Sequence, residues 1–527
     1  MTLTLRRAGI IVALGMLGLT LGACSSLRTD FVKKPSKALP PTTSTPSGRY
    51  IRSEVDQHLD QSGFRLLTNN NNALMSRIAL ADHAQHSIDL QYYIFDNDAT
   101  GRLVAQHLLA AADRGVRVRI LLDDLDVNSE IDMMAALNTH PNIRVRLFNP
   151  FNSRKPSLLS KVTQFLFDAN RLNRRMHNKS FVVDNNVAIV GGRNIGNDYF
   201  DAGSETNFRD LDLIAIGPVV KEASHTFDEY WNSDSAYPVK AFRGKQANHY
   251  DLAQLRVDLT HDARTFAQSD YAQATLDALP DGPTADRPGS WFWGPATLVA
   301  DQPEKIETKT DDPALRIGPQ IRTMIDRAQQ NVLLISPYFV PGESGTRYFS
   351  GLAARGIDVQ LLTNSLASTD EPAVHAGYSR YRYPLLQNGV HIHELRPAPG
   401  VTQSATAKGT SSGISLHAKA IVVDKHWVFV GSMNLDQRSK LLNTEMGIII
   451  DSPQLADAVT QFFDTAILPA NAYVVVLSPK GTPRAGEMQW QTSDDGKPVI
   501  YNRDPEAATG RRMEVWFLKL LPIEGML

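Results

Sequence analysis

The sequence of 527 residues contains a single cysteine, Cys24. One thiol cannot form a disulfide within the chain, and its isolation excludes zinc fingers and cysteine-ligated clusters. Net charge is also nearly absent, because 54 Lys and Arg oppose 56 Asp and Glu to leave −2. This balance gives no general electrostatic attraction for nucleic acid. No apolar run after Cys24 is long enough to cross a bilayer, so we expect any membrane attachment at the N-terminus.

The composition that remains is typical of a globular protein, with 42% hydrophobic and 21% charged residues. Such a chain can bury a sizeable core and is neither disordered nor collagen-like. Its length predicts two or three domains.

The first 24 residues have the pattern of an export signal. Arg6 and Arg7 precede an apolar stretch over residues 8–20, which ends in Leu-Gly-Ala-Cys at Cys24. This resembles a bacterial lipoprotein signal, which implies that Cys24 is lipidated and that the protein is anchored in the cell envelope, facing the periplasm. Ser25 favours the outer over the inner membrane by analogy with lipoprotein sorting. A retained signal anchor is the alternative, but its apolar stretch falls short of the roughly twenty residues of a spanning helix.

Residues 25–58 are rich in Pro, Ser and Thr, with Pro35, Pro40, Pro41 and Pro46 near their centre. This composition predicts a flexible tether without a core of its own.

Past the tether the chain repeats one plan of strand, helix, stop glycine and strand. The copies are predicted at residues 88–95, 100–114 and 116–122, and again at 332–340, 346–355 and 357–363. The alternation predicts an α/β fold of two pseudo-symmetric domains, each with a mostly parallel or mixed sheet flanked by helices. We place the N-terminal domain at 59–240, a connector at 241–300, the C-terminal domain at 301–480 and an extension at 481–527.

The repeat is sharpest around two histidines, His177 and His417. In each copy Lys, Asp, Gly and Asn follow the His by 2, 7, 14 and 17 residues, which gives Lys179, Asp184, Gly191 and Asn194, and Lys419, Asp424, Gly431 and Asn434. Strand alternation puts His and Lys on one face and Asp on the other, so the Asp is expected to lie away from the imidazole. A tight turn at Asp184 and its counterpart would return the chain as a hairpin that delivers the Asn.

If pseudo-symmetry brings both copies together at the domain interface, they form a phosphate site. The lysines would supply positive charge and the Asn amides hydrogen bonds, without a metal. One neutral imidazole can attack phosphorus, while the other acts as acid and then as base. Such a pair predicts a bell-shaped pH profile.

These motifs resemble the HxKxxxxD signature of the phospholipase D superfamily, across both halves from about residue 60. The resemblance implies a phosphohistidine intermediate, no metal cofactor and a site between two similar domains. It also implies that a later acid orients each catalytic His. Asp210 fits this place in the first half and Glu445 fits it in the second half. His177 would be the nucleophile and His417 the acid/base, while Asp184 and Asp424 would be structural.

Further segments are similar to the bacterial cardiolipin synthase branch of that superfamily, in particular to its C type: residues 171–177, 192–200, 291–295, 373–378 and 520–524. The resemblance implies transfer of a phosphatidyl group to phosphatidylglycerol, with phosphatidylethanolamine as a possible donor. The export signal departs from the many cardiolipin synthases that have transmembrane helices, which leaves the membrane side open.

Three segments are candidates for lipid contact. Arg171, Arg174 and Arg175 would lie on anionic head groups, or on a solvated helix face. Residues 291–293, Trp-Phe-Trp, would be an interfacial anchor, or packing at the domain seam. Residues 399–413 would form a mobile rim over the site, or only a long loop. His375 is left out of the catalytic set, since an isolated His is usually structural.

Competing interpretations remain. A phospholipase D-type hydrolase would use the same residues with water as acceptor. A nuclease is disfavoured by the low net charge, the lack of long basic runs and the export signal. A non-catalytic membrane-tethered lipoprotein is disfavoured because both motif copies are intact. No nucleic acid partner is expected, and the sequence does not name an accessory protein.

Overall fold

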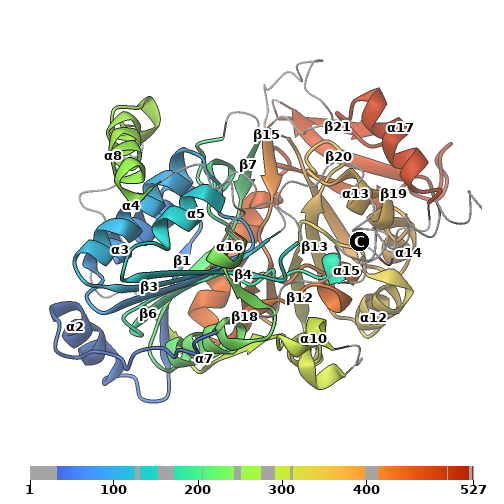
Figure 1. The fold of residues 1–527 in the computed structure, drawn as a ribbon. Helices are drawn as coiled ribbons and strands as arrows, with labels where there is room; N and C mark the ends of the chain where they lie inside the picture. Colours follow the sequence, from blue (N-terminus) through green and yellow to red (C-terminus); the bar gives the residue numbers. More distant parts are fainter. Residues whose placement is uncertain are drawn as a thin grey trace, which may run out of the picture.

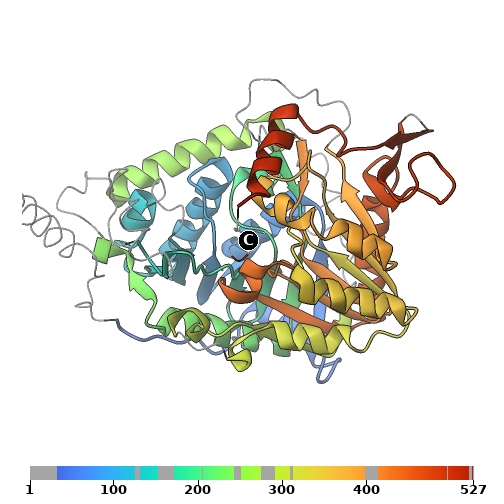
Figure 2. The same cartoon turned by 90° about the vertical axis from the view of Figure 1, so that its right-hand side faces the viewer.

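The computed structural model describes residues 33–124, 131–151, 171–203, 206–242, 251–273, 291–308, 312–397, 413–494, 496–521 and 525. These residues form two large mixed sheets with helices on their faces (Figures 1 and 2). The predicted α/β fold with two similar halves is confirmed.

The first sheet has nine strands in the order β10-β1-β8-β6-β5-β2-β3-β4-β9. They are β1 (Ser62–Leu67), β2 (Ser87–Tyr92), β3 (Arg117–Asp123), β4 (Ile143–Phe148), β5 (Ser180–Val183), β6 (Val187–Gly191), β8 (Asp212–Ile216), β9 (Ala236–Pro238) and β10 (Phe292–Gly294). β2, β3 and β4 are parallel, and the remaining pairs are antiparallel. The helices are α3 (Asn70–His83), α4 (Ala99–Asp113), α5 (Ile131–Leu137), α7 (Pro218–Asn232) and α8 (Leu252–Ala267).

The second sheet repeats this arrangement in ten strands, in the order β11-β18-β17-β16-β12-β13-β14-β19-β20-β21. They are β11 (Ala296–Ala300), β12 (Asn331–Ile335), β13 (Asp358–Asn364), β14 (His391–Leu395), β16 (Ala420–Val423), β17 (Trp427–Gly431), β18 (Met446–Asp451), β19 (Ala472–Leu477), β20 (Met488–Asp494) and β21 (Lys497–Tyr501). Its helices are α10 (Glu304–Glu307), α11 (Gly318–Ile325), α12 (Gly342–Ala354), α13 (Pro372–Tyr378), α14 (Arg382–Gln387), α15 (Gln437–Leu441), α16 (Pro453–Ala466) and α17 (Thr509–Leu518).

Local sequence explains the repeated helix. α4 begins where the side chain of Asp98 accepts a hydrogen bond from Gly101 N at 2.9 Å, and it ends before Gly115, whose φ is +97°. α12 ends in the same way before Gly356, with φ +87°. Both helices bury one apolar stripe and lead into the parallel strands β3 and β13.

The two halves share one apolar core. It combines Phe64, Val190 and Leu213 of the first half with Leu333, Ile448 and Phe463 of the second. A small parallel sheet also joins the halves, because β7 (Thr206–Arg209) pairs with β15 (Gly413–Leu416). This shared packing fixes the relative position of the two motif copies.

The predicted tether differs from the structure over the residues described, which begin at Lys33. Ser36 N donates to Asn232 Oδ1 at 3.0 Å, Ala38 N donates to Asp228 Oδ2 at 2.7 Å, and Arg119 Nη1 donates to Ser36 O at 3.0 Å. α2 (Pro46–Val55) then forms behind the N-cap Thr45. The segment is extended but bound, because distant side chains satisfy its backbone, and composition alone cannot reveal such partners. Residues 25–32 and Cys24 lie outside the described residues.

The region predicted as a connector also contains more structure than expected. α8 buries Leu255 and Leu259 in the core of the first half. The apolar residues 252, 255, 259, 263 and 266 have helical spacing, so the pattern was present in the sequence. β10 then extends the first sheet and β11 the second, while β20 and β21, predicted as an extension, continue the second sheet.

No helix within the described ranges is long and apolar enough to cross a membrane.

Candidate active site

Each catalytic-motif histidine is held by backbone of the opposite half. His417 directly follows β15, and its N–H donates to Arg209 O at 2.8 Å. His177 follows a bridge between Met176 and Thr444, and its N–H donates to Thr444 O at 2.9 Å. Arg209 and Thr444 immediately precede the two predicted acids, so each His is placed beside the acid of the other half. The expectation that each half supplies the acid for its own His was wrong in this respect, because the backbone pairing crosses the interface.

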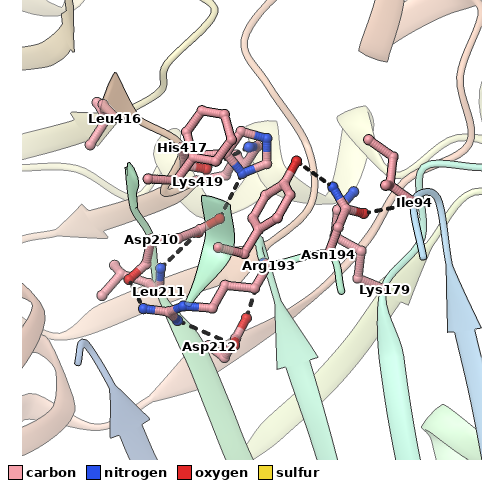
Figure 3. Close-up of polar contacts among 12 residues, drawn as sticks. Ile94, Lys179, Arg193, Asn194, Asp210, Leu211, Asp212, Leu416, His417 and Lys419 are labelled. Carbon is pink, nitrogen blue, oxygen red and sulfur yellow. Dashed lines mark hydrogen bonds and ion pairs between the residues drawn. The ribbon is translucent and has the colours of Figure 1, made fainter. Parts of the chain in front are cut away.

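The side chains complete this crossed arrangement. His417 Nδ1 lies 2.6 Å from Asp210 Oδ2, and His177 Nδ1 lies 2.8 Å from Glu445 Oε2 (Figure 3 shows the first pair). The carboxylate contact occupies Nδ1 and fixes the orientation of the imidazole ring. Nε2 of each ring is therefore the nitrogen that can take part in the reaction. Both histidines line one cavity of about 560 Å³ at the domain interface.

The asparagines and the lysines of the motif lie at different places around the histidines. Asn194 and Asn434 line the cavity with the histidines. Lys179 and Lys419 are almost fully buried, and each Nζ donates to the carbonyl of the His two residues before it. Asn194 accepts from Ile94 N at 3.2 Å and donates to Tyr199 OH at 2.7 Å (Figure 3). Asn434 Oδ1 has no hydrogen-bond partner among the described residues.

The motif aspartates lie elsewhere, as strand alternation predicts. Asp184 accepts hydrogen bonds from the backbone N–H groups of Gln85, His86 and Ser87. Asp424 accepts equivalent bonds from residues 329, 330 and 331. Each carboxylate thus fastens its hairpin turn to the segment that starts the neighbouring antiparallel strand, β2 or β12.

The matched glycines allow two strands to approach closely. A Cβ at Gly191 would lie 2.2 Å from Asp212 Oδ1 and 2.5 Å from Leu211 O. At Gly431 it would lie 2.3 Å from Met446 O. Leu211 and Met446 directly follow the acids, so these glycines set the distance between the motif hairpin and the strand that carries the acid.

Burial controls the charges of the first histidine pair. Desolvation lowers the pKa of His177 to about 4, although Glu445 opposes this shift. Burial would raise the pKa of Glu445, but His177, Lys179 and Ser432 outweigh it and the pKa is lowered. At neutral pH a neutral imidazole therefore donates Nδ1–H to an ionised carboxylate.

The second pair differs. Burial lowers the pKa of His417 well below its usual value, and nearby Lys419 lowers it further. Burial raises the pKa of Asp210 to about 7, against the effect of Lys419 and Arg193. Desolvation also lowers the pKa of Lys179 to about 7 and that of Lys419 to about 8. Near neutral pH the Asp210 carboxyl is therefore partly protonated, while the His417 imidazole is neutral.

Hydroxyl groups explain part of this asymmetry, and sequence reasoning missed them. Ser432 Oγ donates to Glu445 Oε2 at 2.5 Å, and Ser439 Oγ donates to Oε1 at 2.7 Å. In the first half Gly192 occupies the position of Ser432, and Asp210 Oδ1 accepts from Leu211 N at 2.7 Å. The available signal was that Ser432 in the second copy stands where the first copy has Gly192, both directly after the matched glycine.

Aromatic rings surround both imidazoles and were also missed. Tyr93 contacts His177 with ring centroids 5.0 Å apart. Tyr199, Phe208 and Tyr338 lie 5.2, 5.0 and 6.5 Å from His417. These rings pack against the imidazoles and help to hold their orientation.

The three candidate lipid contacts have other roles where they are described. Arg175 is buried and donates to Leu172 O, while Arg171 and Arg174 donate to the carbonyls of residues 150 and 305. The three side chains are therefore bound to the protein and do not form a solvated basic face. Trp291 lies beside Arg65, and Trp293 stacks on His58 with ring centroids 3.8 Å apart, both within the first half. Phe292 between them packs against the apolar core that the two halves share, so this segment packs at the seam. Residues 399–412 lie outside the described residues. His375 is buried against Asp504, away from the catalytic pair.

Comparison with known proteins identifies the family. A family model described as cardiolipin synthase, PLD-like domain, matches residues 78–231 and 321–467. The chain belongs to this phospholipase D-like family of cardiolipin synthases. The two matched segments contain both motif copies and both acids, so the predicted superfamily resemblance is confirmed.

Curated members of the family support this assignment. Cardiolipin synthase C of Escherichia coli (strain K12) is 38% identical over 479 residues, which are 89% of this chain and 97% of that protein. Cardiolipin synthase of Geobacillus kaustophilus (strain HTA426) is 28% identical over 391 residues, 73% of this chain and 62% of the relative.

The fold also matches the crystal structure of phosphatidylserine synthase from Haemophilus influenzae Rd KW20. The TM-score is 0.54 at 13% identity, covering 91% of this chain and 99% of the other. At this identity the likeness concerns the fold alone.

Proposed function

We propose that this protein is a phosphatidyltransferase that makes cardiolipin by transferring a phosphatidyl group to phosphatidylglycerol through a phosphohistidine. The observation that carries the proposal is the crossed pair of His–carboxylate contacts at one cavity, which two asparagines also line. The two lysines lie buried beside the histidines, to whose carbonyls their Nζ atoms donate. Family membership supports the lipid substrate.

The first step uses His177 as nucleophile. Its Nε2 lone pair attacks the phosphorus of the donor lipid while ionised Glu445 accepts Nδ1–H and stabilises the growing positive charge on the ring. The bond from phosphorus to the head-group oxygen breaks. The His417–Asp210 pair transfers its proton through His417 to this leaving alkoxide.

In the second step an oxygen attacks phosphorus and the nitrogen of His177 is the leaving group. Neutral His417 removes the proton from a primary hydroxyl of phosphatidylglycerol, whose oxygen attacks phosphorus. The P–N bond to His177 breaks, which releases cardiolipin and restores both imidazoles.

The two pairs differ in a way that favours this division of labour. Glu445 is held ionised by hydroxyl donors and by His177, which suits a nucleophile that must stay neutral on Nε2. The pKa of Asp210 near 7 suits a pair that gives and regains a proton. Lys179, Lys419 and the Asn amides would stabilise the charge on the non-bridging oxygens.

The cavity wall also suits an ammonium head group on the donor. Asp370 and Glu371 line the cavity, and burial raises the pKa of both carboxyl groups. A cationic head group would supply the counter-charge that these acids need. We therefore propose phosphatidylethanolamine as donor.

We further propose that Cys24 is lipidated and anchors the protein in the bacterial cell envelope, facing the periplasm, in the outer or inner membrane. The basic pair, short apolar stretch and Leu-Gly-Ala-Cys sequence support this placement. Mass spectrometry of the mature N-terminal peptide tests it. An acylated Cys24 is expected, and an unmodified peptide beginning at Met1 would refute it.

The test of the activity uses vesicles with isotopically labelled phosphatidylglycerol, with and without phosphatidylethanolamine. Wild-type protein should yield labelled cardiolipin, and His177→Ala should yield none. His261→Ala, which changes an exposed His on α8, is the matched control and should behave as wild type. Phosphatidic acid without cardiolipin would replace the proposal with a hydrolase.

A further inference from the structure

The last helix carries an exposed apolar face. Met513, Trp516, Phe517 and Leu520 are 66%, 65%, 57% and 64% exposed. Their spacing of 3, 1 and 3 residues places all four on one side of α17 and of the turn that follows it. Scattered apolar side chains are common on protein surfaces, but four large ones on one helix face indicate an interaction site.

The opposite side of α17 is bound to the wall of the catalytic cavity. Val515 is buried and packs in a small core with Ala376 of α13. The guanidinium of Arg511 donates to Thr369 O, directly before the cavity residues Asp370 and Glu371. Residues 373 and 374 of α13 also line the cavity. Figure 1 shows α17 beside α13.

Only the inner side of α17 is therefore needed for its attachment to the protein. The four exposed side chains are held next to the reaction site without contributing to the core on which the helix rests. A surface that binds these four side chains would therefore lie next to the segment that forms the cavity wall.

We propose that the apolar face of α17, defined as Met513, Trp516, Phe517 and Leu520, docks on the surface of a lipid bilayer. This inference rests on the proposed function, because both proposed substrates reside in a bilayer and must pass from it to the cavity. Trp and Phe rings suit head-group depth, and Lys519 of the same segment, which is exposed, can remain among the head groups. Docking there would place the cavity wall at the membrane.

The first test measures insertion with the full chain. Trp516 lies on the proposed face, so its fluorescence in vesicles of phosphatidylcholine and phosphatidylglycerol should be quenched when the lipids are brominated. The Trp516→Phe variant should lose most of the quenching that brominated lipids cause. The Trp293→Phe variant, which changes a ring stacked on His58, should retain it. Equal quenching in wild type and Trp516→Phe would overturn the proposal.

The second test separates docking from catalysis. Replacing Phe517 and Leu520 together by Glu should slow turnover of vesicle lipids at least tenfold, yet change turnover of monomeric short-chain lipids less than twofold. Val257→Glu, at a residue 64% exposed on α8, should alter neither rate. An equal loss on both substrates, or on neither, would contradict docking.

The two tests also distinguish the possible failures. If wild type turns over neither lipid but Trp516 is still quenched, the proposed function fails and the docking surface stands. Sedimentation without lipid gives the alternative outcome. If wild type is a dimer, the double Glu variant is a monomer and Trp516 is not quenched, the face binds a second copy and the proposal is wrong.

Discussion

Nδ1 of His177 lies 2.8 Å from Oε2 of Glu445, a residue 268 positions later in the other half of the molecule. The corresponding contact of His417 with Asp210 crosses the interface in the opposite direction. Each half thus supplies the acid that orients the histidine of its partner, and neither half holds a complete His–acid pair. The two-domain arrangement is therefore a requirement of the site.

The crossed pairs predict which imidazole responds to which acid. Glu445→Gln should shift the ¹⁵N resonances of His177 and leave those of His417 nearly unchanged, while Asp210→Asn should do the reverse. Each substitution should lower turnover about 10²- to 10⁴-fold, because it removes the charge that stabilises and orients the ring. NMR of ¹⁵N-histidine-labelled protein checks the assignment. It would be contradicted if each substitution shifted the histidine of its own half instead.

Stability should depend on pH through Asp210. Burial raises its pKa from the usual value to about 7, so the folded state binds a proton that the unfolded state has lost. The free energy of unfolding therefore falls as pH rises toward 7. Above pH 7 the folded protein carries the full destabilisation of a buried, ionised Asp210. Asp210→Asn removes this cost but keeps an acceptor for His417.

The expected result is that Asp210→Asn exceeds wild type at pH 5 by less than half of the gain that it shows at pH 8, because the cost accumulates from the ordinary pKa of 3.8 up to about 7. The gain is on the order of a few kcal/mol, since each pKa unit corresponds to about 1.4 kcal/mol. Urea unfolding midpoints at both pH values measure it. Asp457→Asn, at an exposed position of α16, is the control and should show the same difference from wild type at both pH values. A larger gain at pH 5 than at pH 8 would refute the argument.

Motif spacing predicted much of the site, because His, Lys, Asp, Gly and Asn of each copy belong to one hairpin. The positions of Asp184 at the turn and of Asn194 after β6 follow from local strand geometry. The crossed acids do not follow from it. They depend on the pairing of β7 with β15 and of Met176 with Thr444, which are contacts between residues more than 200 positions apart in the chain.

Other features were missed for different physical reasons. The backbone of residues 36–42 is satisfied by side chains such as Asn232 and Asn186, so a Pro-rich segment that composition assigns to a tether lies bound on the domain. In contrast, the spacing of Leu255 and Leu259 predicts α8, and the polar composition around them concealed it.

The motif glycine should be intolerant of even one methyl group. Gly191→Ala would place Cβ 2.5 Å from Leu211 O and the Cα of Asp212, on the strand that follows Asp210. We expect a loss of about 1–3 kcal/mol in the free energy of unfolding, with reduced turnover. Gly351→Ala on α12 meets no atom within 4 Å and should be neutral or stabilising by up to about 1 kcal/mol. Chemical denaturation compares them, and equal stability of the two variants would disprove the steric argument.

Binding of a phosphate-like anion should weaken with rising pH and depend on the buried lysines. Sulfate remains a dianion between pH 6.5 and 9, so the titration reports the protein alone. Because burial lowers the pKa of Lys179 to about 7 and of Lys419 to about 8, both are largely neutral at pH 9 in the free protein. An anion that needs their charge must bind together with protons.

We expect sulfate affinity to be at least tenfold weaker at pH 9 than at pH 6.5, with proton uptake at pH 8 in calorimetry across buffers of different ionisation enthalpy. Lys179→Met should abolish most of this binding, whereas Lys240→Met, at an exposed residue, should not. An affinity independent of pH over this range would show that the lysines are not the anion site.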